Sequence, residues 1–236
     1  MDLICYLSNG YPTLERSVEI AKDYVKGGCD IIEIDFPSRD PYLEGELISS
    51  RMAKALEVCD DYDVYMKEMI QVKELLSSTS FILLAYENTI EEIGVEKFTS
   101  FCTTNGFIDI ILCGIKDDVI KDHLIAHGLK ISCYVQRAME HSEVDYAFSS
   151  NGFVYLQAKS DKEYPEFPTL ASCIEFLRER GISRPIYCGV GIHTLEDVKM
   201  AKEAGSDAVF VGSTILKLQD NSPKLIQTIK DFKSHC

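Results

Sequence analysis

The chain has 236 residues, of which 46% are hydrophobic, and this is enough for one domain with one large core. Its formal net charge of −14 argues against nucleic acid as a partner, because a phosphate polymer would be repelled rather than attracted. The charge does not exclude a phosphorylated metabolite, since a few backbone N–H groups can bind one phosphate inside an acidic protein.

The nine cysteines do not indicate a disulfide framework. Several of them lie in or beside apolar, strand-like runs, where a reduced thiol behaves as a small hydrophobic group. The first residues have neither the basic segment nor the long apolar segment of a signal peptide. No run approaches the roughly 18 to 20 apolar residues that a membrane span needs. We therefore expect a cytoplasmic protein that binds neither a membrane nor nucleic acid.

Eight short apolar runs alternate with longer amphipathic stretches along the chain. Most runs are continuously apolar, which is typical of parallel strands that are covered on both faces. The predicted strands are Leu3–Leu7, Asp30–Ile34, Phe81–Tyr86, Ile108–Leu112, Lys130–Val135, Phe153–Leu156, Pro185–Cys188 and Ala208–Val211.

The stretches between these runs have helical spacing. In Leu14–Val25 the apolar residues recur every three to four positions, Thr13 is placed to cap the helix, and Gly27 ends it. The longest stretch, Pro37–Ser80, is predicted to hold two helices, Leu47–Val58 and Tyr65–Leu76.

No linker, low-complexity segment or change in composition divides the chain. Eight strand–helix units within 236 residues favour a closed barrel over an open, doubly wound sheet, which usually needs more sequence for eight strands. The sequence thus predicts an α/β protein whose residues 1–236 form a single (β/α)₈ TIM barrel.

Two glycine-rich turns follow the last two predicted strands. Glycines at these places let backbone N–H groups approach a phosphate closely, and a following helical turn adds its positive end. In (β/α)₈ barrels this is a frequent place for a phosphate site. The alternative, that the glycines only make tight turns, stays open. The candidate phosphate-binding residues are Gly189, Gly191, Ile192, Gly212 and Ser213.

The second strand carries carboxylates near its C-terminal end. Side chains alternate along a strand, so Glu33 and Asp35 share one face, and they face the barrel interior if Ile32 and Ile34 pack against the helices. A carboxyl group in such a place has a raised pKa or needs partners, and a raised pKa suits an acid–base catalyst. The alternative is a structural carboxylate that is hydrogen-bonded to backbone or to a neighbouring tyrosine. Glu44, in the following loop, is a second candidate for proton transfer.

The histidines do not form an evident metal site. His123 and His127 are four residues apart on a predicted helix, but no third ligand is apparent, so we interpret them as surface residues. His193 can contact a phosphate or cap the helix that begins near Thr194. No dinucleotide fingerprint follows the first strand, and the sequence predicts neither a metal nor a cofactor.

The sequence resembles the tryptophan synthase α subunit family over nearly the whole chain. The resemblance is carried by landmarks that occur in the same order: Tyr6–Pro12, Asp30–Ile34 followed by Pro37, Asp40, Pro41 and Gly45, Leu84–Asn88 with its Tyr-x-Asn, Gly152–Leu156, and the two glycine turns.

The resemblance implies a (β/α)₈ barrel that cleaves indole-3-glycerol phosphate to indole and glyceraldehyde 3-phosphate. It implies that Glu33 protonates indole C3, and that Glu44 takes the place of an aspartate that interacts with the indole N–H. Tyr155, Tyr86 and Asp35 become candidates for substrate contact. The implied partner is a pyridoxal-phosphate-dependent β subunit that receives the indole.

The sequence departs from the family pattern at several places. Glutamate replaces aspartate at Glu44, and Asp35 replaces the usual glycine. The loop after the sixth strand, Gln157–Pro165, lacks the arginine and the Thr-Gly of the family's mobile loop. The stretch Leu112–Lys116 differs from the family's Val-Pro-Asp-Leu-Pro, on the side where the β subunit docks.

These departures keep two alternatives open. One is a divergent barrel enzyme that acts on another phosphorylated small molecule. The other is a catalytically inactive protein that acts as a binding or activating partner.

Overall fold

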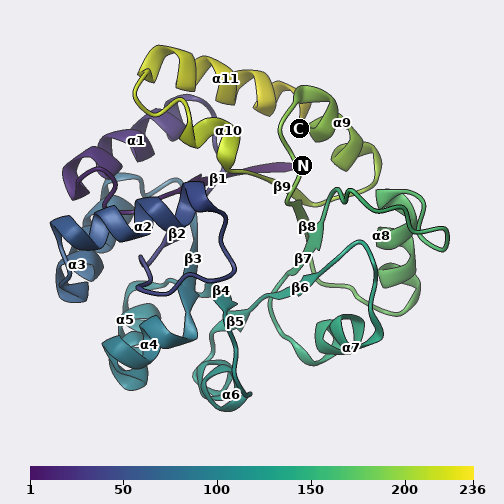
Figure 1. The fold of residues 1–236 in the computed structure, drawn as a ribbon, viewed down its shortest axis with the longest axis horizontal. Coiled ribbons are helices and arrows are strands. Elements are labelled where there is room, and N and C mark those ends of the chain that lie inside the picture. The colour runs from purple at the N-terminus through teal and green to yellow at the C-terminus, as the bar shows by residue number, and fades with distance from the viewer.

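The computed structural model describes residues 1–236 and has one parallel sheet that closes on itself (Figure 1). The order of the strands is β5-β4-β3-β2-β1-β9-β8-β7-β6, and every pair is parallel. The strands are β1 (Asp2–Leu7), β2 (Ile31–Asp35), β3 (Ser80–Tyr86), β4 (Asp109–Cys113), β5 (Lys130–Ile131), β6 (Cys133–Val135), β7 (Val154–Gln157), β8 (Ile186–Gly189) and β9 (Ala208–Val211).

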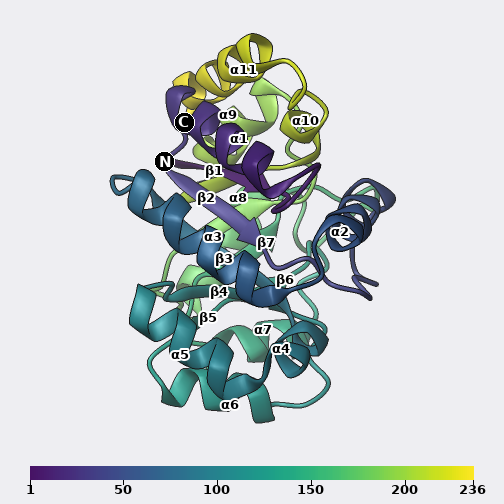
Figure 2. The ribbon, with the colours of Figure 1, turned by 90° about the vertical axis from the view of Figure 1, so that its left-hand side faces the viewer.

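Helices surround the barrel on its outside, and α2 lies beside the C-terminal ends of the strands, opposite the two chain termini (Figure 2). The helices are α1 (Leu14–Lys26), α2 (Glu46–Val58), α3 (Tyr62–Leu75), α4 (Glu87–Ile93), α5 (Val95–Asn105), α6 (Val119–Ala126), α7 (His141–Ser149), α8 (Leu170–Glu179), α9 (Leu195–Glu203), α10 (Ser213–Leu216) and α11 (Ser222–His235). The predicted barrel is confirmed.

The fifth predicted strand is interrupted at Ser132. Its first part, β5, pairs with β4, whereas its second part, β6, pairs with β7. The Ser132 N–H still donates to Ile110 O at 3.0 Å, and the Cys133 N–H already donates to Phe153 O at 3.3 Å. The pairing therefore passes from one neighbour to the other within two residues, and the upper part of β4 separates from β6.

The helix boundaries follow from local capping. The Thr13 side chain accepts a hydrogen bond from the Arg16 N–H at 3.2 Å, which confirms the predicted start of α1. The second helix of the long stretch begins at Tyr62, three residues earlier than predicted. The reason is Asp61, whose carboxylate accepts from the Asp63 N–H at 2.9 Å and caps α3.

The alternation of side chains along the strands produces two apolar layers. Outward-facing residues such as Leu3, Cys5 and Leu7 join the large core of 54 buried residues between sheet and helices. Inward-facing residues such as Ile4 and Phe210 belong to a smaller cluster of 10 inside the barrel. Polar residues on the inward face near the C-terminal ends of the strands are thus placed directly above an apolar floor.

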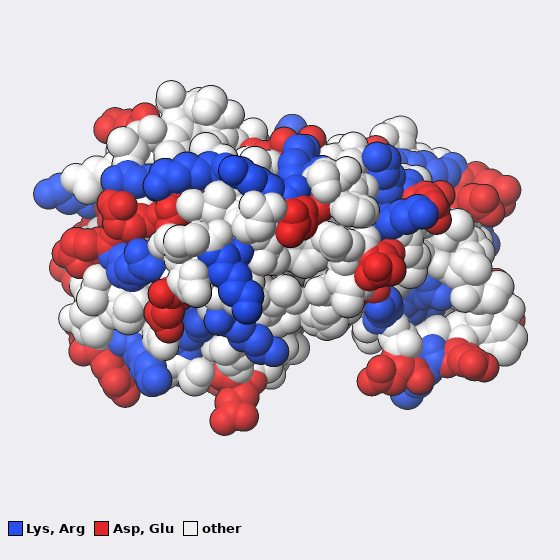
Figure 3. Space-filling model, turned by 90° about the horizontal axis from the view of Figure 1, so that it is seen from above, with Lys and Arg blue, Asp and Glu red and all other residues white.

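None of the helices is both long enough and apolar enough to cross a bilayer. On the face seen from above, Lys and Arg side chains are interspersed with Asp and Glu rather than gathered by sign (Figure 3).

Candidate active site

A cavity of about 800 Å³ opens at the C-terminal ends of the strands. This is the end of a (β/α)₈ barrel at which active sites are built, because the strand ends and βα loops converge there. Of its 23 lining residues, 14 are hydrophobic, so a mostly apolar molecule fits it. The part that lies between β4 and β6, where the sheet is opened, is lined by Ile111, Leu112, Cys113, Gly114, Ser132 and Tyr134.

Glu33 is the buried acid of this cavity. It lies on β2 beside Tyr6 of β1, lines the cavity and is only 5% exposed. No hydrogen bond from the protein reaches its carboxyl group. Burial, followed by the nearby Glu44 and Asp35 carboxylates, holds the pKa of Glu33 well above its ordinary value. The raised pKa favours the protonated form of Glu33, which can donate a proton to a ligand in the cavity.

Glu44 lines the same cavity from the loop after β2. It is half-buried, and the Tyr86 hydroxyl donates to its Oε1 at 3.4 Å. Burial raises the pKa of Glu44, and the hydrogen bond from Tyr86 opposes that rise. Tyr86 itself is completely buried and does not line the cavity, so it acts on Glu44 rather than on a ligand.

Asp35 is completely buried and lies outside the cavity lining. The Tyr6 hydroxyl donates to its Oδ2 at 2.7 Å, and the Asn9 N–H donates to its Oδ1 at 2.6 Å. Burial raises the pKa of Asp35 to about 7, although both hydrogen bonds act in the opposite direction. Asp35 therefore has the structural role that the sequence left open. Its carboxyl group holds Tyr6 at the cavity wall and fixes the turn after β1.

The two glycine turns present unpaired backbone N–H groups to the cavity. Gly191, Ile192, Gly212 and Ser213 all line it. The N–H groups of Gly191, Ile192 and Gly212 donate to no acceptor within the protein. Ser213 begins α10, and the N–H of a first helical residue has no partner inside its helix. Converging free donors of this kind bind phosphate without a cationic side chain.

The backbone of the first turn is strained. Val190 has a φ of 56°, a left-handed conformation that is a rare outlier for a β-branched residue, and Gly191 follows with a φ of 97°. Such strain is held only where the surrounding structure enforces it, and it gathers at binding sites. The strain supports the interpretation of this turn as a ligand cradle rather than a simple connection.

Gly189 has a different role from the one predicted. It is the last residue of β8, is buried and does not line the cavity. A Cβ atom there would lie 2.5 Å from Cε2 of Tyr155, so glycine is required for the Tyr155 ring to pack. That ring lines the cavity and stacks on Phe210 with their centroids 4.4 Å apart.

His193 lines the cavity beside the free amides, but its own backbone N–H is occupied. That N–H donates to Asp197 Oδ2 at 2.9 Å, whereas Thr194 is the residue that caps α9. The His193 ring lies 3.3 Å from the Ser213 hydroxyl through Nδ1. The ring therefore remains available to a ligand. The His193 side chain does not cap α9, so the structure does not support the capping alternative.

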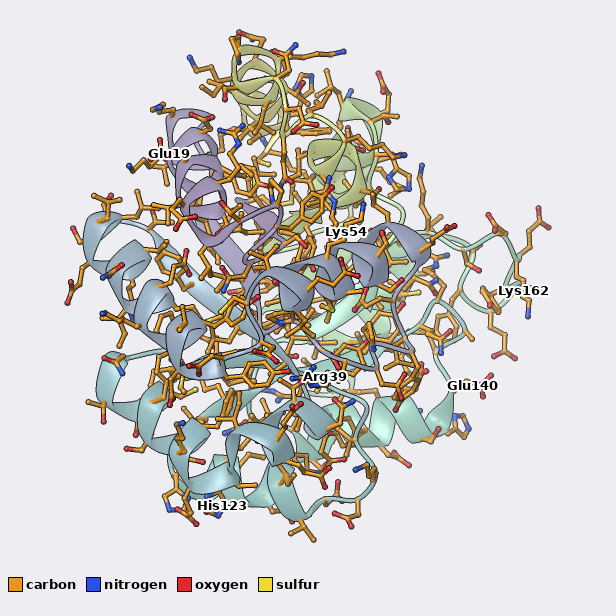
Figure 4. The ribbon with its side chains drawn as sticks, turned by 60° about the vertical axis from the view of Figure 1, so that its left-hand side comes forward. Glu19, Arg39, Lys54, His123, Glu140 and Lys162 are labelled. Carbon is orange, nitrogen blue, oxygen red and sulfur yellow. The ribbon has the colours of Figure 1, made fainter.

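The loop after β7 projects from the body of the protein, with Lys162 at its outer end (Figure 4). At its base, Lys159 forms an ion pair with Asp197, next to the first glycine turn. The loop supplies no residue to the cavity lining. The loop in which the sequence departs from the family pattern therefore lies beside the cavity and is not part of its wall.

Several residues that line the cavity were not predicted from the sequence. Ser132 and Tyr134 line it from the interrupted strand, and Gln136 lines it from the position after β6. A signal was present, because these polar residues alternate with Ile131, Cys133 and Val135, which face the outer core. Tyr6, from the first strand, lines the cavity as well.

Relatives of known identity match the whole chain. The family profile described as "Tryptophan synthase alpha chain" matches residues 1–236. The tryptophan synthase alpha chain of Methanosarcina barkeri is 29% identical over 240 residues, which cover 98% of this chain and 90% of that protein. The alpha chain of Dehalococcoides mccartyi is 29% identical over 235 residues, which cover 94% of this chain and 89% of that one.

Solved structures share the fold. Tryptophan synthase from M. tuberculosis, in an open form, superimposes with a TM-score of 0.84 at 22% identity, covering 99% of this chain and 92% of that one. The alpha subunit from Legionella pneumophila gives a TM-score of 0.84 at 23% identity with the same coverage of both chains. With the family profile matched from end to end, this chain belongs to the tryptophan synthase alpha chain family.

Proposed function

We propose that this chain is a lyase that cleaves indole-3-glycerol phosphate to indole and glyceraldehyde 3-phosphate by a retro-aldol reaction. One observation carries the proposal. A buried Glu33 whose pKa is raised and a set of unpaired backbone N–H groups open into the same mostly apolar cavity. Membership of the family favours this reaction over another phosphorylated substrate or an inactive partner.

The cavity would hold the substrate by its two ends. The phosphate would accept hydrogen bonds from the amides of Gly191, Ile192, Gly212 and Ser213. The indole ring would occupy the apolar part of the cavity, against the stacked Tyr155 and Phe210 rings. The glycerol carbon that carries the breaking bond then lies between the phosphate and the ring.

The chemistry needs one proton given and one proton taken. Glu33 donates its proton to indole C3, which makes the ring an iminium ion with a tetrahedral C3. The hydroxyl group on the adjacent glycerol carbon loses its proton, the bond from that carbon to C3 breaks, and its electron pair restores the aromatic ring. The Glu33 carboxylate takes up the hydroxyl proton and is again protonated. Glu44 accepts a hydrogen bond from the indole N–H and stabilises the positive charge of the intermediate.

The direct test is indole release from the purified chain supplied with indole-3-glycerol phosphate. Glu33→Gln should lower kcat by about 10²- to 10⁴-fold, the usual contribution of one general acid–base group, with little change in KM. The variant should remain folded, because the amide has the same shape as the buried carboxyl group and carries no charge. Glu179→Gln, an exposed change on α8, is the matched control and should leave kcat unaltered. Wild-type protein that releases no indole, or a Glu33→Gln variant as active as wild type, contradicts the proposal.

We also propose a tryptophan synthase β chain as the partner that receives the indole. Tyr42 and Leu43, in the loop beside the cavity mouth, are each 62% exposed, and exposed large apolar groups at one place are typical of interaction surfaces. Tyr42→Glu should weaken association with a β chain by at least about tenfold in a sedimentation or calorimetric titration, because a charge would be buried there. Equal affinity of wild type and variant would exclude this loop from the interface.

A further inference from the structure

Three side chains on the outside of the barrel join α5 to α6. Glu96 lies in the first turn of α5, His123 lies in α6, and His127 is the residue that ends α6. One ligand atom from each of the three lies within 4.8 Å of the others. We propose that Glu96, His123 and His127 form a binding site for one divalent transition-metal ion, with Zn²⁺ as the best match.

The His127 ring is held in the tautomer that a metal needs. Its Nδ1 lies 2.8 Å from the backbone carbonyl oxygen of His123, so Nδ1–H donates to that oxygen. Nε2 then carries a free lone pair. This arrangement, in which one ring nitrogen is bonded to a carbonyl and the other is left for the ion, is the usual one for histidine ligands.

His123 presents an unpaired nitrogen toward the same point. Its Nε2 atom is buried and has no hydrogen-bond partner, and it lies 3.7 Å from Oε1 of Glu96. The centroids of the two imidazole rings are 4.2 Å apart and their planes differ by 32°, so the faces of the rings lie close to each other. An unsatisfied buried nitrogen costs free energy, and an ion between the two helices would remove that cost.

Glu96 is free to serve as the third ligand. No lysine or arginine pairs with it, and the one basic side chain within 4 Å of its carboxylate is His123. Lys121, the nearest cation on α6 in sequence, pairs with Asp118 and Asp122 instead. The carboxylate therefore keeps its charge for a cation placed between it and the histidines.

The three ligand atoms lie within 4.8 Å of one another, so the side chains must rotate before they surround a tetrahedral ion. Zinc–ligand bonds of about 2.0–2.1 Å at the tetrahedral angle place ligand atoms about 3.3 Å apart. The separation of 3.7 Å between His123 Nε2 and Glu96 Oε1 is only a few tenths of an ångström longer. Glu96 is exposed and can close the difference by rotation. Two nitrogens and one carboxylate oxygen fit Zn²⁺, with water in the fourth position.

The site lies away from the cavity. His127 lies three positions before the first residue of β5, and strands begin at the end of the barrel opposite the active site. Figure 4 shows His123 at the outer edge of the molecule. None of the three residues lines the cavity. An ion here would join α5 to α6 beside the interrupted strand and stabilise the barrel without a part in the reaction.

The two histidines lie at the surface, as predicted, but Glu96 lies beside them as a third possible ligand that no sequence pattern revealed. Glu96 is 27 positions before His123, on another helix, and no local spacing pattern links the two. Only the packing of α5 against α6 brings the carboxylate to the histidines.

The test is a titration of the intact, reduced chain with Zn²⁺, followed by calorimetry and by thermal unfolding. Wild type should bind one ion and unfold at a higher temperature with Zn²⁺ than with chelator. Glu96→Gln, His123→Gln and His127→Gln should each weaken binding by about tenfold or more, since even changes around a ligand cost 10- to 100-fold. His235→Gln, at a partly exposed histidine on α11, should bind as wild type does.

Cysteines could bind the ion elsewhere, because all nine are free. Co²⁺ in place of Zn²⁺ separates the cases, because thiolate ligands give an intense near-ultraviolet charge-transfer band and imidazole or carboxylate ligands do not. Absence of that band supports the proposed site. A strong thiolate band, binding that survives all three substitutions, or no binding by wild type overturns it. The test does not measure indole release, so its result for the metal site is independent of the result for the lyase activity.

Discussion

Glu33 and Glu44 are two carboxyl groups of one cavity with different surroundings. Glu33 is buried, receives no hydrogen bond and faces two other carboxylates, so its pKa is strongly raised. Glu44 is half-buried and accepts a hydrogen bond from Tyr86, so its pKa rises less. Two carboxyl groups whose pKa values are driven apart can act together as acid and base at one pH.

The pH dependence of the reaction follows from this difference. Glu33 must be protonated to act as the acid, so kcat/KM falls as pH rises through its raised pKa. Glu44 must be ionised to accept the indole N–H, so kcat/KM also falls toward acid. Glu44→Gln should lower kcat/KM by roughly 10- to 100-fold, the value of a hydrogen bond to a charged group, and should remove the acid limb. Rate measurements across a pH series check this. An unchanged acid limb in the variant would exclude Glu44 from the reaction.

At the scale of elements, the turn between β8 and α9 unites backbone strain with the proposed phosphate site. Gly191 has a φ of 97°, and a Cβ atom there would lie 2.6 Å from Cβ of Lys159. Gly205, in the turn before β9, has a similar φ of 89° but no atom within 4 Å of such a Cβ. The two glycines share a positive φ, which glycine adopts without strain, and differ in their surroundings.

This pair gives a controlled substitution. Gly191→Ala and Gly205→Ala should both lose about 1 kcal/mol or more of stability, because alanine disfavours a positive φ. Gly191→Ala should lose more, since Lys159 must move, and should also bind inorganic phosphate at least about tenfold more weakly. Gly205→Ala should bind phosphate as wild type does. Urea unfolding and a phosphate titration measure both effects, and equal phosphate affinity in the two variants would remove Gly191 from the phosphate site.

The elements were largely predictable because hydrophobic runs are local. Each of the eight predicted strands is found within one or two residues of its predicted bounds, apart from the interruption at Ser132. That interruption depends on which neighbour, β4 or β7, each amide reaches, and this is a property of the closed barrel. The site was predictable in part: Glu33 and the two glycine turns could be recognised from position in the strand order. The roles of Asp35 and Gly189 could not, because they depend on Tyr6 and Tyr155, which lie on other strands.

For the molecule as a whole, buried acids make stability depend on pH. Glu68, on α3, is 6% exposed, and burial raises its pKa from 4.5 to about 7. Its Oε1 lies 3.4 Å from the Ser17 hydroxyl of α1, whereas its Oε2 has no partner. The folded protein holds this proton more tightly than the unfolded chain does. The stability gained from the protonated form is therefore complete below about pH 4.5 and is lost as pH rises toward about 7.

Glu68→Gln tests this dependence. The amide cannot ionise, so the variant should lose the part of the decline in unfolding free energy between pH 4.5 and 7 that Glu68 causes. That part is roughly 3 kcal/mol, because folding raises the pKa of Glu68 by about 2.5. The pKa of Asp35 is also about 7, so ionisation of Asp35 still causes a smaller decline in the unfolding free energy of the variant. Urea unfolding at several pH values measures the slopes, and identical slopes in the two proteins would show that Glu68 is ionised in the folded state.

A structure of the Glu33→Gln variant with bound indole-3-glycerol phosphate would show whether the phosphate amides and the buried acid act on one substrate. We expect phosphate oxygens about 3 Å from the nitrogens of Gly191, Ile192, Gly212 and Ser213. We also expect indole C3 about 3.5 Å from the side chain at position 33. A phosphate bound away from these amides, or an indole ring that does not reach position 33, would contradict the proposed function.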